Sequence, residues 1–317
     1  MAMAQPTSIS LLARRPLVSY FVLAYALAWL LWLPLVLSKG GGIGLIPFTT
    51  PPDVSSLLTS LIIVIGSLGP ALAAIIMSVS VGGWTEVKQL LRRMIQVRAG
   101  IQWYLVAVFV PLVASLLPVL LFGGSAVFLS VFSFQGAKSL LIYVGATLID
   151  MVLGSPIGEE PGWRGFALPR LQQRYGALTG SLILGPLWAL WHLPLFLTVW
   201  GALYQSIGVP VGLLLFTLTV MCYTIVMTWL FNNTRGSIFL AILTHSAIDS
   251  RLIFFLVLFS QAAQAITTPS KSGAAAYLSG LLGLAITWAV IALLLIALTK
   301  GRLSYKLPVS KEAQAAV

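Results

Sequence analysis

Residues 17–37 read LVSYFVLAYALAWLLWLPLVL and contain no charged side chain. A helix needs about 20 such residues to cross the hydrocarbon core of a bilayer, so this stretch is long enough to span a membrane. It follows Arg14 and Arg15 and has no small-residue cleavage site, which favours a retained first span over a removed signal peptide.

Similar apolar runs recur along the rest of the chain. They lie at about 56–80, 102–123, 138–158, 177–200, 208–231, 238–260 and 276–299. Together with the first run they predict about eight transmembrane helices, joined by loops too short to hold a soluble domain. We therefore expect an all-α polytopic membrane protein whose residues 1–317 form a single transmembrane domain.

The composition agrees with a membrane protein. Hydrophobic residues make up 59% of the chain and charged residues only 8%, whereas soluble domains are about a quarter charged. A water-soluble enzyme, a disordered tail and a nucleic-acid-binding module are therefore poor fits. The single cysteine, Cys222, excludes an internal disulfide framework and a cysteine-based zinc cluster.

The basic residues predict how the chain is oriented. With an even number of spans, the termini and alternate loops lie on one side of the membrane. Of the 18 Lys and Arg residues only four fall on the other side: Lys39, Lys138, Arg251 and Lys271. The positive-inside rule then places both termini in the cytoplasm. An Ala- and Gly-rich composition and the lack of an organelle targeting signal favour a bacterial inner membrane.

Residues 84–102 differ from the spans on either side. Apolar residues recur there at helical spacing, with basic residues between them: Val87, Leu90, Leu91, Met94 and Val97 alternate with Lys88, Arg92, Arg93 and Arg98. This pattern predicts a basic amphipathic helix at the cytoplasmic interface, between the second and third spans. The alternative is a loop helix packed on its neighbours.

Few ionisable residues lie within or at the ends of the predicted spans. The acids are Asp150, Glu159, Glu160 and Asp249, and both histidines of the chain, His192 and His245, also fall there. Each costs about 2.5–3.5 kcal/mol at membrane depth even on a lenient scale, so such residues indicate function by default. The alternative is that they only hold helices together.

Spacing assigns different roles to the two neighbouring glutamates. Glu160 and Arg164 are four residues apart, so on a helix they share a face and pair. Glu159 points about 100° away from Glu160. Pro161 and Gly162 predict that the helix breaks, with Pro161 opening a new one. Irregular backbone at this depth is tolerated where it lines a wet cavity, which predicts a water-accessible site near Glu159.

The histidines complete a candidate active site. Trp188 and His192 are one helical turn apart, as are His245 and Asp249. Either Glu159 or a histidine acts as general base on a water, or Glu159, His192 and His245 bind a metal such as zinc. Both chemistries lead to hydrolysis of an acyl bond, with His245 or Asp249 stabilising the oxyanion. The alternatives are a core histidine at 192 and a packing aromatic at 188.

Four short stretches resemble a known family. Residues 159–165 read EEPGWRG, residues 168–171 LPRL, residues 188–194 WALWHLP and residues 245–249 HSAID. This resembles the CPBP family of intramembrane proteases, which includes CAAX prenyl endopeptidases and bacteriocin-processing or self-immunity proteins with about eight helices. The family pattern is EExxxR, then FxxxH, then HxxxN or HxxxD. Here Trp188 stands where Phe is usual, and the third motif ends in Asp249.

The resemblance implies a protease core at about 138–260. By position, Glu159 would activate the hydrolytic water together with His192, and His245 and Asp249 would stabilise the oxyanion. Glu160 and Arg164 would hold these groups in position without contacting the substrate, and Trp188 would line the pocket.

The expected activity is that of a CAAX prenyl protease-like endopeptidase. It would cleave a membrane-associated, prenylated or precursor peptide within the bilayer, with zinc assistance left open and no nucleic-acid partner. A rival is a non-proteolytic scaffold or bacteriocin self-immunity protein that keeps the motifs for structure. A small transporter is a third class, which the clustering of the polar residues at one level disfavours.

Overall fold

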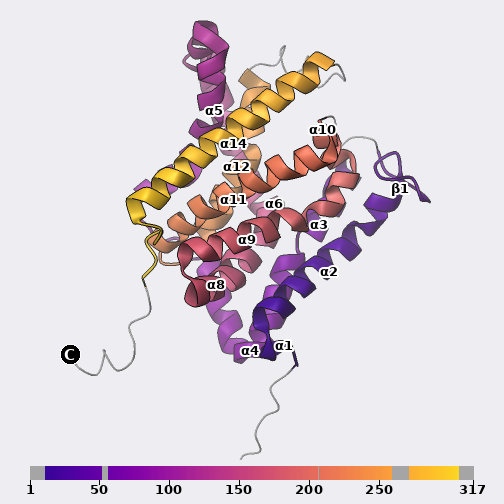
Figure 1. Cartoon of the computed structure of the whole chain (residues 1–317), viewed down its shortest axis with the longest axis vertical. Helices are drawn as coiled ribbons and strands as arrows, with labels where there is room; N and C mark the ends of the chain where they lie inside the picture. Colours follow the sequence, from indigo (N-terminus) through magenta and orange to yellow (C-terminus); the bar gives the residue numbers. More distant parts are fainter. Residues whose placement is uncertain (1–10, 52–55, 206, 259–270, 307–317) are drawn as a thin grey trace, which may run out of the picture.

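A computed structural model describes residues 11–51, 56–205, 207–258 and 271–306 (Figure 1). Over these residues the chain is almost wholly helical, and eight helices are long and apolar enough to cross a membrane. The chain is therefore an all-α polytopic membrane protein, as predicted. Both chain ends lie outside the described residues. They include Lys311, one of the 18 Lys and Arg residues counted for the orientation.

The elements follow the predicted spans closely. In chain order they are α1 (Leu11–Arg14), α2 (Pro16–Leu37), β1 (Ser38–Lys39), β2 (Ile46–Thr49), α3 (Leu57–Gly66), α4 (Gly69–Met94), α5 (Ile101–Val131), α6 (Phe134–Leu153), α7 (Pro156–Glu160), the π-helix η1 (Pro161–Ala167), α8 (Leu168–Tyr175), α9 (Ala177–Trp191), the 3₁₀ helices η2 (Leu193–Leu197) and η3 (Val199–Gly201), α10 (Ala202–Gln205), α11 (Val209–Asn233), α12 (Ile238–Leu258) and α14 (Lys271–Thr299). Strands β1 and β2 pair in parallel and form a small two-stranded sheet after α2.

Helix α2 packs against α4 through small residues. Its buried face includes Tyr20, Ala24, Ala28 and Trp32, which are four residues apart and therefore lie along one side of the helix. A Cβ on Gly69 would lie 2.8 Å from the backbone nitrogen of Ala28. The two helices thus approach too closely for a larger residue, which is typical of helix contacts in membranes.

The predicted basic helix lies after a sharp kink in α4. At Gly83 the backbone is not helical, with φ at 63° and ψ at −162°, so residues 84–94 form a helical segment distinct from the membrane-spanning part. In this last part Val87 is buried and Lys88 is exposed, so the predicted amphipathic character is present. Glycine permits the kink because it has no Cβ to clash at positive φ. The predicted basic helix is therefore present between the second and third spans; it is joined to the second span through Gly83 and ends at Met94.

The chain from α7 through η1 to α8 stays helical where a break was predicted at Pro161 and Gly162. Helix α6 ends at Leu153, and α7 leads directly into the π-helix that starts at Pro161. Proline has no N–H for an ordinary helical bond, and the wider π turn accommodates that loss without ending the helix. A Cβ on Gly162 would lie 2.3 Å from the Tyr20 hydroxyl, so glycine is needed there for packing.

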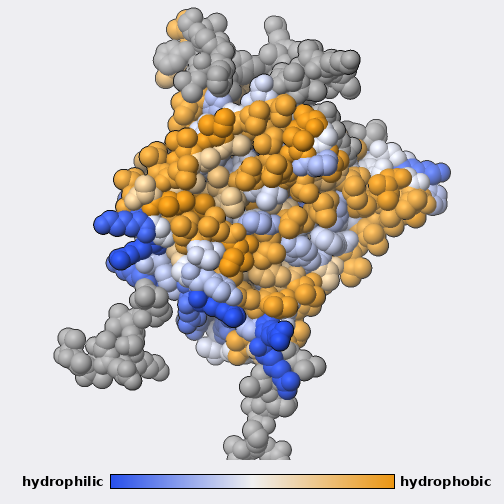
Figure 2. Space-filling model, viewed as in Figure 1, coloured by the Kyte–Doolittle hydropathy of each residue, from blue (hydrophilic) through white to orange (hydrophobic). Residues whose placement is uncertain are grey.

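The surface has the distribution expected of a membrane protein. Figure 2 shows a broad hydrophobic belt, with hydrophilic residues gathered toward the lower end of the view. Helices α1, α4 and α8 reach that same end in Figure 1. A belt of this kind is suited to lipid, because apolar side chains that face hydrocarbon need no hydrogen-bond partner.

Candidate active site

The three sequence motifs come together from three parts of the chain. Glu159 and Glu160 end α7, Trp188 lies near the end of α9, with His192 directly after it, and His245 lies in α12. Segment α7 contacts α12 and η1, while η1 contacts α9. Glu159 is 2% exposed and His245 4% exposed. The predicted polar residues therefore form one buried cluster.

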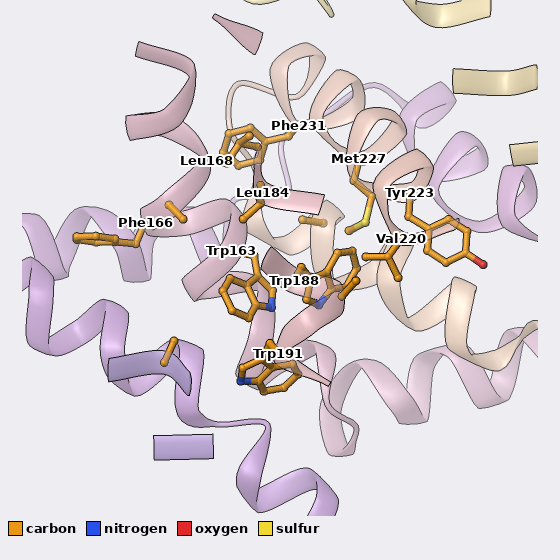
Figure 3. Close-up of a cluster of buried hydrophobic side chains, with 14 of the residues drawn as sticks. Trp163, Phe166, Leu168, Leu184, Trp188, Trp191, Val220, Tyr223, Met227 and Phe231 are labelled. Carbon is orange, nitrogen blue, oxygen red and sulfur yellow. The ribbon is translucent and has the colours of Figure 1, made fainter. Parts of the chain in front are cut away.

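Glu159 is held by two tryptophans. The indole N–H groups of Trp163 and Trp188 donate to the same carboxylate oxygen, Oε2, at 3.2 Å and 2.7 Å. In Figure 3 the two indole nitrogens face each other across the cluster. Two neutral donors hold the carboxylate in place without neutralising its charge. They leave Oε1 as an acceptor for a water or a substrate group.

Glu160 has charged partners instead. Its Oε1 accepts hydrogen bonds from Arg164 Nη1 and from His245 Nδ1, both at 2.8 Å. The predicted pair with Arg164 is present, and both side chains are fully buried. Burial lowers the pKa of the Arg164 guanidinium, and the carboxylates of Glu160 and Glu159 oppose that shift. Glu160 thus ties the first motif to the third.

Trp188 connects the two glutamates. Its ring lies 4.2 Å from the Arg164 guanidinium carbon, in a cation–π contact, while its N–H reaches Glu159. The same ring contacts His245 edge-on, with centroids 5.0 Å apart. An aromatic side chain with a polar N–H is suited to this position because it packs on a cation and still donates.

His192 presents one ring nitrogen to the site. Its Nδ1 lies 3.0 Å from the Trp188 carbonyl oxygen, which only accepts, so Nδ1 carries the hydrogen. In the neutral ring Nε2 is then an acceptor. The ring stacks on Trp200 with centroids 5.6 Å apart, which holds its orientation. Among the described residues, the hydrogen bond of His192 is to the Trp188 carbonyl and not to Glu159.

Asp249 lies at the edge of the cluster. Its Oδ2 is 3.6 Å from Nε2 of His245, and its side chain is 40% exposed. That distance is too long for a hydrogen bond, although it allows a charge interaction. The structure therefore brings Glu159, Glu160, Arg164, Trp188 and His245 into direct contact and leaves Asp249 more loosely attached.

The donor set as it stands does not fit a metal ion. Among the described residues, no group of three or more His, Cys, Asp or Glu side chains has an arrangement that could hold one. His245 Nδ1 is engaged by Glu160, and Glu159 Oε2 by two indoles. The zinc site predicted at Glu159, His192 and His245 stays a prediction.

Two aromatic partners of the site were missed from the sequence. Trp163 lies four residues after Glu159, a helical spacing that puts the two on one face, so the signal was present. Trp200 lies after the 3₁₀ segment η2, and no periodic pattern connects it to His192. Trp200 reaches the His192 ring only because of the way the chain turns after α9.

Comparisons with known proteins single out the same region. Residues 139–251 match the family of type II CAAX prenyl endopeptidase Rce1-like proteins. The similarity to this family is therefore confined to these residues, about a third of the chain. A CAAX prenyl protease 2 from Methanococcus maripaludis is 34% identical over 151 residues. That alignment covers 47% of this chain and 51% of the relative, so it spans about half of each. The Rce1-like segment contains every candidate site residue from Glu159 to Asp249.

Proposed function

We propose that this protein is an intramembrane endopeptidase of the CAAX prenyl protease type. Its water would be activated by Glu159 together with His192. One observation carries this proposal. Two indole N–H groups donate hydrogen bonds to the Glu159 carboxylate, and both bonds end on Oε2. A buried carboxylate with one oxygen left for water is what a general base needs.

The reaction follows from these groups. Glu159 Oε1 takes a proton from water, and the hydroxide oxygen forms a bond to the scissile carbonyl carbon. The carbonyl π electrons move to its oxygen. His245, whose Nδ1 already donates to Glu160, stabilises the oxyanion through Nε2–H in its doubly protonated form. When the C–N bond breaks, the leaving amine takes the proton held by Glu159. His192 Nε2 orients the water by accepting its second hydrogen.

No step in this scheme passes through a metal. Zinc assistance at Glu159, His192 and His245 is tested separately, by metal analysis of the purified protein. One equivalent of zinc, lost together with activity on chelation, would replace the scheme with metal-bound water chemistry.

The substrate is proposed to be a membrane-associated peptide or protein. The related protein from Methanococcus maripaludis is named a CAAX prenyl protease, which supports a prenylated C-terminal segment as substrate. Peptide precursors such as bacteriocins are the other substrates to test. We also propose a bacterial inner membrane, on the basis of the Ala- and Gly-rich composition, and both termini in the cytoplasm, on the basis of the Lys and Arg distribution.

The proposal is tested by comparing peptides from cells that express wild type or Glu159→Gln at matched levels. Membrane and secreted peptides are both collected. Peptide termini present only with wild type would establish proteolysis and identify the cleavage site. Identical peptides from both cell types, with both proteins folded, would contradict it.

A second candidate function has one observation in its favour. Glu160, Arg164 and His245 form a buried network joining segments far apart in the chain, which a non-proteolytic scaffold or self-immunity protein would also keep. The same Glu159→Gln variant distinguishes the two functions. A scaffold tolerates this isosteric change, whereas a hydrolase does not.

A further inference from the structure

A basic cavity lies outside the candidate active site. It has a volume of about 380 Å³ and is lined by residues 98–100, Trp103 and residues 233–235. Its walls are the loop between α4 and α5 and the loop between α11 and α12. The volume lies within the range of small-ligand sites.

The cavity presents positive charge that is not neutralised by the protein. Arg98 and Arg235 both line it, and none of the lining residues is acidic. Both arginines are exposed, and neither guanidinium has a hydrogen bond or ion pair among the described residues. Helix α5 also begins here, at Ile101, and its N-cap residue Gly100 offers no side-chain cap. Two free guanidiniums and open backbone N–H groups together favour a phosphate group.

The position of the cavity indicates where that phosphate comes from. The loops that line it join the ends of membrane-spanning helices, at Met94, Ile101, Asn233 and Ile238. The cavity therefore lies at a membrane face, at the level of lipid headgroups. Trp103 in its wall is a residue type enriched at that interface. Basic pockets between transmembrane helices are suited to anionic headgroups.

The loops around the cavity are braced against each other. Gln96 Nε2 donates to the Thr234 carbonyl at 3.1 Å, and Ser237 Oγ donates to the Gln96 carbonyl at 2.7 Å. Arg93 extends the connection to the active-site segment: its Nε donates to the Gly236 carbonyl and its Nη1 to the Gly165 carbonyl, at 3.0 Å and 3.1 Å. A ligand in this cavity would stabilise loops that also hold η1.

We propose that this cavity binds the phosphate of an anionic phospholipid headgroup. Arg98 and Arg235 contact the phosphate oxygens, and the start of α5 adds backbone donors. The bound lipid stabilises both loops and, through Arg93, the π-helix that carries Arg164. This binding does not depend on proteolytic activity.

The test uses the full chain in neutral detergent, titrated with phosphatidylglycerol, phosphatidylcholine or inorganic phosphate. Bound lipid is counted by native mass spectrometry. Wild type is expected to prefer phosphatidylglycerol, and the double variant R98Q/R235Q to bind it about 25-fold more weakly, from about fivefold per arginine. R98K/R235K, which keeps both charges, should stay within a few-fold of wild type.

The matched control is R14Q/R15Q. It removes the same charge from α1 and the residue after it, where both side chains are exposed and line neither this cavity nor the second basic pocket at Lys88 and Arg92. Its phosphatidylglycerol affinity should stay within about twofold of wild type, because the effect of a charge falls off within a Debye length. Unchanged melting temperatures in phosphatidylcholine confirm that the variants are folded.

Three results would overturn the proposal. R98Q/R235Q could bind phosphatidylglycerol as tightly as wild type does. R14Q/R15Q could lose as much affinity as R98Q/R235Q, which would mean a diffuse charge effect. Inorganic phosphate could bind as tightly as the lipid, which would make a soluble anion the ligand.

Discussion

Glu159 and Glu160 are neighbours in the chain, yet their carboxylates lie in different surroundings. Glu159 accepts hydrogen bonds from two indoles, whereas Glu160 accepts them from Arg164 and His245. The helical turn of about 100° between them sends one side chain toward Trp188 and the other toward α12. Both are buried, so the difference comes from their partners and not from their depth.

This difference separates reactivity from stability. A carboxylate held by two neutral donors on one oxygen has its other oxygen open to accept a proton. A carboxylate that receives an arginine and a histidine is committed to those partners, because breaking a buried pair leaves an uncompensated charge. We therefore expect changes around Glu159 to lower the rate of cleavage, and changes around Glu160 to lower the free energy of unfolding.

The largest expected effect is a loss of cleavage rate when a residue beside Glu159 is changed. His192→Ala should lower the single-turnover cleavage rate by about 10²–10⁴-fold, because general acid–base partners contribute that much. Its stability should change little, since His192 makes one hydrogen bond and is only half-buried. Melting temperature in the same membranes is the control. Cleavage within threefold of wild type would remove His192 from the mechanism.

The next largest expected effect is a loss of stability when Glu160 is changed. Glu160→Leu should lower the free energy of unfolding by about 3–5 kcal/mol, because it leaves Arg164 charged and buried without its partner. The double variant Glu160→Leu/Arg164→Met should recover part of that loss, since no charge is stranded. Denaturant unfolding of the reconstituted protein measures both. A single variant as stable as wild type would contradict the assigned role of Glu160.

A smaller effect distinguishes the two tryptophans that bind Glu159. Trp188→Phe and Trp163→Phe each remove one hydrogen bond to a carboxylate, worth about 1.5–3 kcal/mol. Trp188 should matter more, since its bond is shorter, 2.7 Å against 3.2 Å, and its ring also contacts Arg164. Cleavage rate and melting temperature are compared for both variants. A larger loss for Trp163→Phe would reverse this ranking.

The smallest expected effect is at Asp249. Its carboxylate is 3.6 Å from His245 and 40% exposed, so Asp249→Asn should change the free energy of unfolding by less than about 1 kcal/mol. Cleavage should stay within a few-fold, because the amide keeps an oxygen near Nε2. A rate loss as large as that of His192→Ala would make Asp249 part of the reacting machinery.

Much of the fold was predictable because membrane spans are encoded by composition alone. A run such as residues 17–37 predicts its helix without any tertiary contact. The local details were less accessible. From α7 the chain stays helical through Pro161 because the π turn absorbs the missing N–H, and Gly162 lies too close to Tyr20 for a side chain.

The candidate site was predictable only within each motif. The i,i+4 spacing of Glu160 and Arg164 predicted their pair, since both residues lie on one helix. The bond from His245 to Glu160 joins residues 85 positions apart, and no spacing rule connects them. The hydrogen bonds of Arg93 were missed for the same reason. Its carbonyl partners lie in η1 and in the loop before α12, far from Arg93 in the sequence.

The most direct measurement is the single-turnover cleavage rate of Glu159→Gln beside Glu160→Gln, in the same lipid and with the identified substrate. We predict that Glu159→Gln loses about 10²–10⁴-fold in rate at an unchanged melting temperature, and that Glu160→Gln loses mainly stability. Cleavage by folded Glu159→Gln at the rate of wild type would contradict the proposal that Glu159 activates the water.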